Sequence, residues 1–320
     1  MTLTSPSPSP GSSAAPDRAQ DIRTVREARG VVPGDGITMA WAQWPGAGPT
    51  VVGLHGITAS YMNFVGVADR LAGRRPLLAL DLRGRGDTDK PEAGPFGMAQ
   101  HAHDVAAAMT SFGLDGAVVV GHSMGAFVAV ALAAEHPELV RGLVLVDGGL
   151  PLQAPPGVDR TQLLDVALAP QMARLRATFP SFDAYLDFWR ALPPFEGDRW
   201  NEWVEAYLRY DLGGVEPRLR PKASEAAVRG DFLDSLDADR MRDRLRGLSV
   251  PTLLLRATEG FNPGTPPLLP DDLVAREGAL VPDLTDRVID DTTHYTIALG
   301  PRGASDVADA IVEWAQACGR

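Results

Sequence analysis

The chain has 320 residues, of which 45% are apolar, so it can bury the core of one domain together with an insertion. Its formal net charge of −11 and sequence pI of about 5.0 disfavour nucleic acid or an anionic membrane as the main partner. No apolar run approaches the roughly 20 residues that a membrane-spanning helix requires. We therefore expect a small-molecule substrate, and the negative charge favours a neutral one.

The two ends of the chain carry little functional signal. Residues 1–20 are rich in Ser, Pro and Ala and lack the basic start and apolar centre of a secretion signal, which predicts a disordered tail. The single cysteine, Cys318, cannot form an internal disulfide, which suits a reducing cytoplasm. We expect a cytoplasmic monomer or homodimer with no cofactor and no nucleic-acid or membrane partner.

Strand and helix signals alternate through the first half of the chain. Residues 24–32 and 37–44 predict a hairpin around the turn cluster Pro33-Gly34-Asp35-Gly36. Apolar runs then predict strands at 51–54, 77–82, 117–121 and 143–146, with helices at about 63–71, at about 98–112 and directly after residue 123. This alternation predicts right-handed crossovers in a mostly parallel sheet.

Five residues, Gly121-His122-Ser123-Met124-Gly125, join one of these strands to a helix of small residues. The two glycines suit a sharp, strained turn, because a side chain at either position would collide with the strand or helix that the turn connects. The turn holds its serine away from the backbone. This G-x-S-x-G pattern between a strand and a helix predicts that Ser123 is a catalytic nucleophile.

The alternation breaks between about residues 150 and 248, where helical segments are interrupted by prolines and no strong strand signal occurs. Ten aromatic residues gather between positions 179 and 210. If this stretch covers Ser123 with its apolar underside, we expect an aromatic-lined pocket that includes Tyr185, Trp189, Trp200 and Trp203. The alternative is that these aromatic residues only form the apolar faces of helices that pack against each other.

The chain resembles the α/β-hydrolase superfamily over roughly residues 25–318. The resemblance is carried, in the superfamily's order, by Val51 to Gly56, Leu78 to Asp89, the Ser123 turn, Val250 to Ala257 and Arg287 to Tyr295. It implies a mostly parallel eight-stranded sheet flanked by helices, with a helical lid (cap) inserted after the sixth strand. The core would then occupy residues 21–149 and 249–320, and the lid residues 150–248.

A serine hydroxyl is a weak nucleophile, so Ser123 needs a base, and an imidazole can take its proton at neutral pH. Of the six histidines, His294 alone follows a strand near the C-terminus, where the superfamily carries its base. We predict that His294 is the base. The remaining histidines are assigned to the His-Gly turn (His55), the variable position of the Ser123 turn (His122), the start of a surface helix (His101 and His103) and the end of a helix (His136).

An acid should orient the imidazole and stabilise its cationic form. Most of the superfamily carries this acid after the seventh strand, where this chain offers only Glu259. A minority of families carry it at the end of the sixth strand, where this chain has Asp147. We favour Asp147, because a short carboxylate at a strand end is held more rigidly, and keep Glu259 as the alternative.

The tetrahedral intermediate of acyl transfer needs hydrogen-bond donors for its negative oxygen. By resemblance, these are the backbone N–H groups of Met124 and Ile57. Both donors are main-chain groups, so their side chains reveal little about the chemistry.

Two arginines, Arg83 and Arg85, lie in a charged, glycine-rich loop. A substrate carboxylate is one candidate partner for them. We favour instead ion pairs within the loop, with the carboxylates that it contains: Asp81, Asp87 and Asp89.

These residues predict a serine hydrolase that cleaves a carboxylic ester or lactone of a neutral, largely apolar small molecule. Cleavage of a C–C, amide or thioester bond and cofactor-free perhydrolysis on the same residues stay open, as does a non-catalytic small-molecule receptor on this fold. Ser123 argues against dehalogenases and epoxide hydrolases, which attack with an aspartate at this turn. The sequence contains no phosphate-binding glycine loop and no H-E-x-x-H metal motif.

Overall fold

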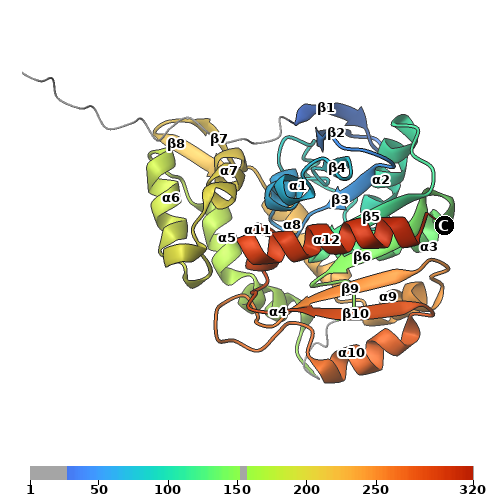
Figure 1. The fold of residues 1–320 in the computed structure, drawn as a ribbon. Helices are drawn as coiled ribbons and strands as arrows, with labels where there is room; N and C mark the ends of the chain where they lie inside the picture. The colour runs from blue at the N-terminus through green and yellow to red at the C-terminus, as the bar shows by residue number, and fades with distance from the viewer. Residues whose placement is uncertain (1–26, 152–156, 320) are drawn as a thin grey trace, which may run out of the picture.

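The computed structural model describes residues 27–151 and 157–319, and it contains one eight-stranded sheet in the order β1-β2-β4-β3-β5-β6-β9-β10 (Figure 1). The strands are β1 (Ala28–Pro33), β2 (Thr38–Trp44), β3 (Val51–Leu54), β4 (Leu77–Leu80), β5 (Ala117–His122), β6 (Val140–Val146), β9 (Thr252–Ala257) and β10 (Leu284–Ile289). The pairs β1–β2 and β2–β4 are antiparallel, and every later pair is parallel. The mostly parallel sheet and its opening hairpin are confirmed. The expected tail at 1–20 lies outside the described residues.

Helices cover both faces of the sheet, which explains the continuous apolar runs of its central strands. Val118 and Val120 of β5 point to the face that carries α1 (Val65–Leu71), α11 (Thr296–Leu299) and α12 (Pro301–Ala317). Val119, between them, points to the face that carries α2 (Met98–Ser111), α3 (Met124–Glu135), α9 (Ala238–Arg246) and α10 (Asp271–Glu277). Short 3-10 helices add η1 (Tyr61–Phe64), η2 (Pro137–Leu139) and η5 (Gly278–Leu280).

The chain leaves the sheet after β6 and returns to it at β9. We call the described residues 157–235 of this excursion the insert. It contains α4 (Arg160–Ala167), α5 (Ala169–Arg176), α6 (Phe182–Arg190), η3 (Pro193–Phe195), η4 (Gly197–Arg199), α7 (Glu202–Asp211), β7 (Leu212–Val215), β8 (Arg218–Pro221) and α8 (Glu225–Ser235). In Figure 1 its α6, α7 and β7–β8 hairpin stand beside the sheet, whereas α9 packs against α3.

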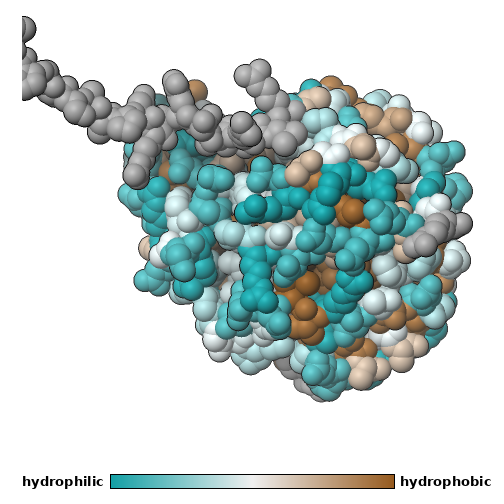
Figure 2. Space-filling view, viewed as in Figure 1, coloured by the Kyte–Doolittle hydropathy of each residue, from teal (hydrophilic) through white to brown (hydrophobic). Residues whose placement is uncertain are grey.

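The β7–β8 hairpin was not expected from the sequence. Its two antiparallel strands have only four residues each and contain Gly213, Gly214 and Pro221, so they give no apolar alternation. Its outer face is open, as Val215 is 81% exposed. Figure 2 shows that hydrophilic residues cover most of one face of the molecule and that hydrophobic residues form only small patches on it.

Candidate active site

Ser123 lies in the turn between β5 and α3 with φ 56° and ψ −120°, a left-handed conformation that is unusual for a residue with a side chain. Two glycines make the turn possible. A Cβ on Gly121 would lie 2.2 Å from the carbonyl oxygen of Gly125, and a Cβ on Gly125 would lie 2.0 Å from that of Leu54. The second clash involves the neighbouring strand β3 rather than the strand and helix that the turn joins. Ser123 therefore sits where three backbone segments meet.

His294 lies in the loop between β10 and α11, and its Nδ1 is 2.6 Å from Oδ2 of Asp147. An ionised carboxylate only accepts hydrogen bonds, so Nδ1 carries a proton and Nε2 of the neutral ring has a free lone pair. The N–H of His294 donates to the carbonyl of Gly260 at 2.9 Å, which fixes the loop. His294 and Ser123 line the same two cavities.

The structure brings Asp147, and not Glu259, to His294. Asp147 follows β6, its N–H donates to the carbonyl of Leu255 at 2.8 Å, and its Oδ1 accepts from the N–H of Ala257 at 3.2 Å. Oε1 of Glu259 instead accepts from the N–H of Gly264 at 3.1 Å within its own loop.

The glycine after Asp147 explains the Asp-Gly-Gly sequence. A Cβ on Gly148 would lie 2.4 Å from the carbonyl oxygen of Ser123, so only glycine lets this loop pass so close to the Ser123 turn. The Asp-Gly-Gly sequence therefore does more than form a turn, because its first glycine allows the loop after β6 to approach the Ser123 turn.

Two other histidines are buried next to this site, and each is satisfied as a neutral ring. Nε2 of His122 donates to the carbonyl oxygen of His294 at 2.9 Å, and its Nδ1 accepts from Asn63 at 3.2 Å. Nε2 of His55 accepts from the N–H of Leu82 at 2.9 Å, and its Nδ1 donates to the carbonyl of Gly56 at 2.8 Å. Burial lowers the pKa of each ring to about 3. Both histidines therefore hold loops in place.

The candidate oxyanion residues, Ile57 and Met124, both lie close to Ser123. Met124 is the first residue of α3, so its N–H belongs to the helix turn that lacks intrahelical acceptors. Ile57 follows β3 in a turn in which the N–H of Ala59 donates to the carbonyl of Gly56 at 3.1 Å. Gly56 approaches Ser123 closely, because a Cβ there would lie 3.3 Å from that of the serine. Ile57, Ser123 and Met124 line one cavity.

Two cavities, of about 70 Å³ and about 270 Å³, meet at five residues: Ile57, Ser123, Leu168, Phe261 and His294. The smaller cavity extends toward Asn63, Gln171 and Tyr295, and the larger one toward Phe127, Phe232 and Leu269. Among the residues that the structure describes, no Lys, Arg or Glu lines either cavity.

Of the four aromatic residues expected in the pocket, Trp189 alone lines a cavity at Ser123. Tyr185 is buried inside the insert, where its hydroxyl contacts Arg174 and Asp211. Trp203 packs against Gly66 of α1, and Trp200 lies under the guanidinium of Arg190 at 4.5 Å. The expectation was wrong for Tyr185, Trp200 and Trp203, because these rings fill the interior of the insert and its contact with the core.

Phe261 was missed by the sequence reasoning although it lies in the loop searched for the acid. It is 42% exposed, and its ring centroid is 4.7 Å from that of His294. Leu168 and Phe232 of the insert were missed as well. Single apolar residues in helical segments give no sign of which cavity they will face.

The pairing expected for the two loop arginines was wrong. Arg83 pairs with Asp104 of α2, and Arg85 pairs with Asp231 of α8. The loop carboxylates have other partners. Asp81 is buried and accepts from the N–H groups of Tyr61 and Asp87 at 2.7 and 2.9 Å, and from the hydroxyl of Tyr210 at 2.5 Å. Asp87 pairs with Lys222, and Asp89 accepts from the N–H of Thr38. Burial raises the pKa of Asp81 to about 6.

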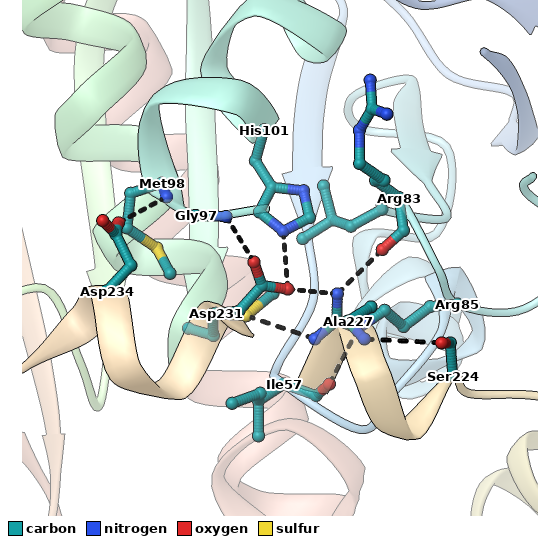
Figure 3. A network of polar contacts seen from close by, with 12 residues as sticks. Ile57, Arg83, Arg85, Gly97, Met98, His101, Ser224, Ala227, Asp231 and Asp234 are labelled. Atoms are coloured by element: carbon teal, nitrogen blue, oxygen red, sulfur yellow. Dashed lines mark hydrogen bonds and ion pairs between the residues drawn. The ribbon is translucent and has the colours of Figure 1, made fainter. Parts of the chain in front are cut away.

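His101 also differs from its predicted surface position. It is fully buried, and its Nε2 lies 2.9 Å from Oδ2 of Asp231 (Figure 3). His103, two residues later, is exposed on α2 as expected. The insert covers the first turn of α2, which periodicity within the helix could not indicate.

In the described ranges, no three His, Cys, Asp or Glu side chains gather as a metal site would require. None of the described helices combines the length and the apolarity that crossing a bilayer needs.

Comparisons with known proteins agree with this architecture. A family model described as "alpha/beta hydrolase fold" matches residues 49–301. The 2-(acetamidomethylene)succinate hydrolase of Mesorhizobium japonicum is 29% identical over 258 residues, which is 80% of this chain and 85% of that protein. The crystal structure of E-2-(acetamidomethylene)succinate hydrolase superposes with a TM-score of 0.74 at 26% identity, over 90% of this chain and 99% of that one.

A thermophilic esterase from Thermogutta terrifontis shares the fold, with a TM-score of 0.67 at 22% identity over 92% of this chain and all of that one. The family match and the 2-(acetamidomethylene)succinate hydrolase indicate a hydrolase. Together with the sheet order and the Ser123 turn, they lead to one conclusion: the chain belongs to the alpha/beta hydrolase fold family.

Proposed function

We propose that the protein is a serine hydrolase that cleaves a carboxylic ester or lactone through an acyl-enzyme, with Ser123 as nucleophile, His294 as base and Asp147 as the acid that orients it. The 2.6 Å contact between Asp147 and His294, beside a serine in a strained turn, carries this proposal. The chemistry needs no metal ion or cofactor.

In this mechanism Nε2 of His294 takes the hydroxyl proton of Ser123 as its Oγ attacks the substrate carbonyl carbon. The N–H groups of Ile57 and Met124 donate to the negative oxygen of the tetrahedral intermediate. His294 then gives the proton to the leaving alcohol, and the acyl group stays on Ser123. A water molecule, activated by His294, attacks the acyl-enzyme and releases the acid.

The shape and lining of the site favour a neutral, largely apolar substrate. Two cavities that meet at Ser123 suit the two arms of an ester, the acyl group and the alcohol. Their described linings hold no Lys or Arg that would pair with a substrate carboxylate. The relative named above acts on a succinate, which carries two carboxylates, so we propose a different substrate for this chain.

Amide hydrolysis is the second candidate within this class. The name of the same relative includes an acetamido group, and the proposed residues would serve an amide in the same way, with His294 protonating the leaving amine.

The test combines covalent labelling with turnover. We expect a fluorophosphonate to add one equivalent to the protein at Ser123, as located by peptide mass spectrometry, and short-chain p-nitrophenyl esters to be hydrolysed with an initial burst of p-nitrophenol. Matched p-nitroanilides separate ester from amide preference. Binding of esters with neither labelling nor turnover would instead support a small-molecule receptor on this fold.

A further inference from the structure

Arg85 is fully buried in the loop after β4. Its guanidinium contacts four residues at once. Nε donates to the carbonyl oxygen of Ile57 at 2.9 Å, and Nη1 donates to the carbonyl oxygen of Arg83 at 2.8 Å and also pairs with Asp231. Nη2 lies 3.8 Å from the sulfur of Met124. Arg85 therefore contacts both residues whose N–H groups are the proposed oxyanion donors.

Asp231, a residue of the insert, pairs with this arginine. It lies on α8, is fully buried, and accepts from the N–H of Gly97 at 2.6 Å and from Nε2 of His101 at 2.9 Å as well as from Arg85 (Figure 3). These three donors hold the pKa of Asp231 well below its usual range, although burial alone would raise it. Asp231 is thus an ionised carboxylate whose own position is fixed by the core.

Backbone contacts fix α8 against the same loop. The N–H of Ser224 donates to the carbonyl of Gly84 at 2.8 Å, and a Cβ on Gly84 would lie 2.4 Å from that of Ala227. The N–H of Met98 donates to Asp234 at 2.8 Å. The contact between α8 and the core is therefore closely packed around the Arg85–Asp231 pair, with little room for it to shift.

We propose that Arg85 is a positioning residue for the oxyanion hole and that Asp231 of the insert holds it in place. The inference rests on the proposed function. Arg85 fixes the carbonyl of Ile57, and so restrains the backbone of the residue whose N–H is the proposed oxyanion donor. An oxyanion donor contributes fully only when it is aimed in advance at the oxygen, so freeing Ile57 should weaken the transition state more than substrate binding.

The chain provides a matched control two residues away. Arg83 is also buried, donates to both oxygens of Asp104 at 2.8 and 2.7 Å, and donates to the carbonyl of Asp35 at 2.7 Å. This pair has the same charges and comparable burial, but it contacts neither Ile57 nor Met124. Breaking either pair leaves one buried charge without its partner and should cost similar stability.

The experiment compares Arg85→Lys and Asp231→Asn with Arg83→Lys and Asp104→Asn, using a p-nitrophenyl ester that the parent hydrolyses. A lysine keeps the charge but cannot reach several acceptors in one plane. Because loss of one whole oxyanion donor costs about 10² to 10³ in kcat, we expect the Arg85 and Asp231 variants to lose about 10- to 100-fold in kcat with KM within about 2-fold. Inhibition by a boronic acid, which forms a tetrahedral adduct with the serine, should weaken by a similar factor.

The Arg83 and Asp104 variants should lower the thermal unfolding midpoint and keep kcat within about 2-fold of the parent. Equal losses of kcat in both pairs, or a rise in KM with unchanged kcat and boronic acid affinity, would overturn the inference. If Arg85→Lys does not fold, Asp231→Asn, which preserves side-chain volume, provides the same comparison with Asp104→Asn. Failure of the proposed function is separate, because the parent would then show neither fluorophosphonate labelling at Ser123 nor ester turnover.

Discussion

The carboxyl edge of the sheet and the insert contribute to the site by different means. At the sheet edge, Ser123, Asp147 and His294 follow β5, β6 and β10, and backbone hydrogen bonds fix their loops. The insert instead supplies cavity walls, such as Leu168 and Trp189. Its polar contacts with the core include three side-chain contacts, Asp231 to Arg85, Tyr210 to Asp81, and Asn201 to the carbonyl of Leu299 at 2.9 Å, as well as the backbone contact of Ser224 with Gly84.

This difference indicates a division of roles. Strand ends are rigid, so they suit groups whose distances must be kept for proton transfer and nucleophilic attack. The helices of the insert lie outside the sheet, so their cavity residues can change without moving the reactive groups at the strand ends. The Arg85–Asp231 pair is one of the contacts between the two regions. The following predictions test how far the roles of the sheet edge and the insert are separate.

Removal of the sheet-edge groups should give the largest effect. We expect Ser123→Ala and His294→Ala each to lower kcat for a p-nitrophenyl ester by about 10⁴- to 10⁶-fold, and the double variant to be little worse, because nucleophile and base act as a unit. Steady-state kinetics with enzyme shown to be folded by circular dichroism measures this. Near-parental turnover in folded Ser123→Ala would rule out the mechanism.

The two carboxylates should differ strongly. Asp147→Asn preserves volume but replaces the acceptor of the Nδ1 proton, which favours the wrong imidazole tautomer, so kcat should fall by about 10³- to 10⁴-fold. Glu259→Gln changes only a contact with Gly264 in its own loop, and activity should stay within about 2-fold. The comparison requires similar unfolding midpoints. The opposite ranking of the two variants would assign the acid to Glu259.

In the insert, cavity residues and packing residues should separate. Trp189→Phe enlarges the smaller cavity at Ser123, so relative kcat/KM among esters of different acyl length should change by about 10-fold. Trp203→Phe removes packing against α1, so it should lower the unfolding midpoint and leave these ratios unchanged. A panel of p-nitrophenyl esters measures both. If Trp189→Phe lowered kcat/KM by the same factor for every ester of the panel, Trp189 would be a packing residue.

The smallest expected effect concerns stability in acid. The folded-state pKa values of His55 and His122, about 3, lie below the ordinary histidine value of 6.5, so between these limits the unfolded chain binds more protons and stability falls as the pH is lowered. Asp81, with its pKa raised to about 6 from 3.8, acts in the opposite direction between pH 6 and 3.8. The effect of the two histidines exceeds that of Asp81, so the unfolding midpoint should fall by roughly 2 to 5 °C for each pH unit as the pH is lowered from 6 to 4.

His122→Gln tests the cause of this slope, since it removes one of the two buried histidines. We expect differential scanning fluorimetry to show a shallower dependence on pH for this variant, whereas the exposed His103→Gln should match the parent. An unchanged slope in His122→Gln would mean that other groups govern the acid sensitivity.

The sequence alone was sufficient for the features that depend on local pattern. Apolar runs and their spacing predicted the hairpin and the parallel strands, because strand and helix periodicity is a property of neighbouring residues. The glycines around Ser123 predicted the strained turn, since the steric limit on φ acts within a few residues. The four-residue strands of β7 and β8 were too short and too rich in glycine to give such a pattern.

Tertiary structure was needed wherever the relevant partner lies far along the chain. Asp147, which contacts His294 from 147 positions away, was favoured by its place at a strand end and by the resemblance, but Glu259 stayed open until the structure showed which carboxylate reaches the ring. The partner of Arg85 is 146 positions away and was not predicted. The same reason applies to His101, which is buried by α8, and to the aromatic residues of the insert, of which Trp189 reaches a cavity while Tyr185, Trp200 and Trp203 do not. Composition determines that such side chains will be buried, but only the packing of distant segments determines what they contact.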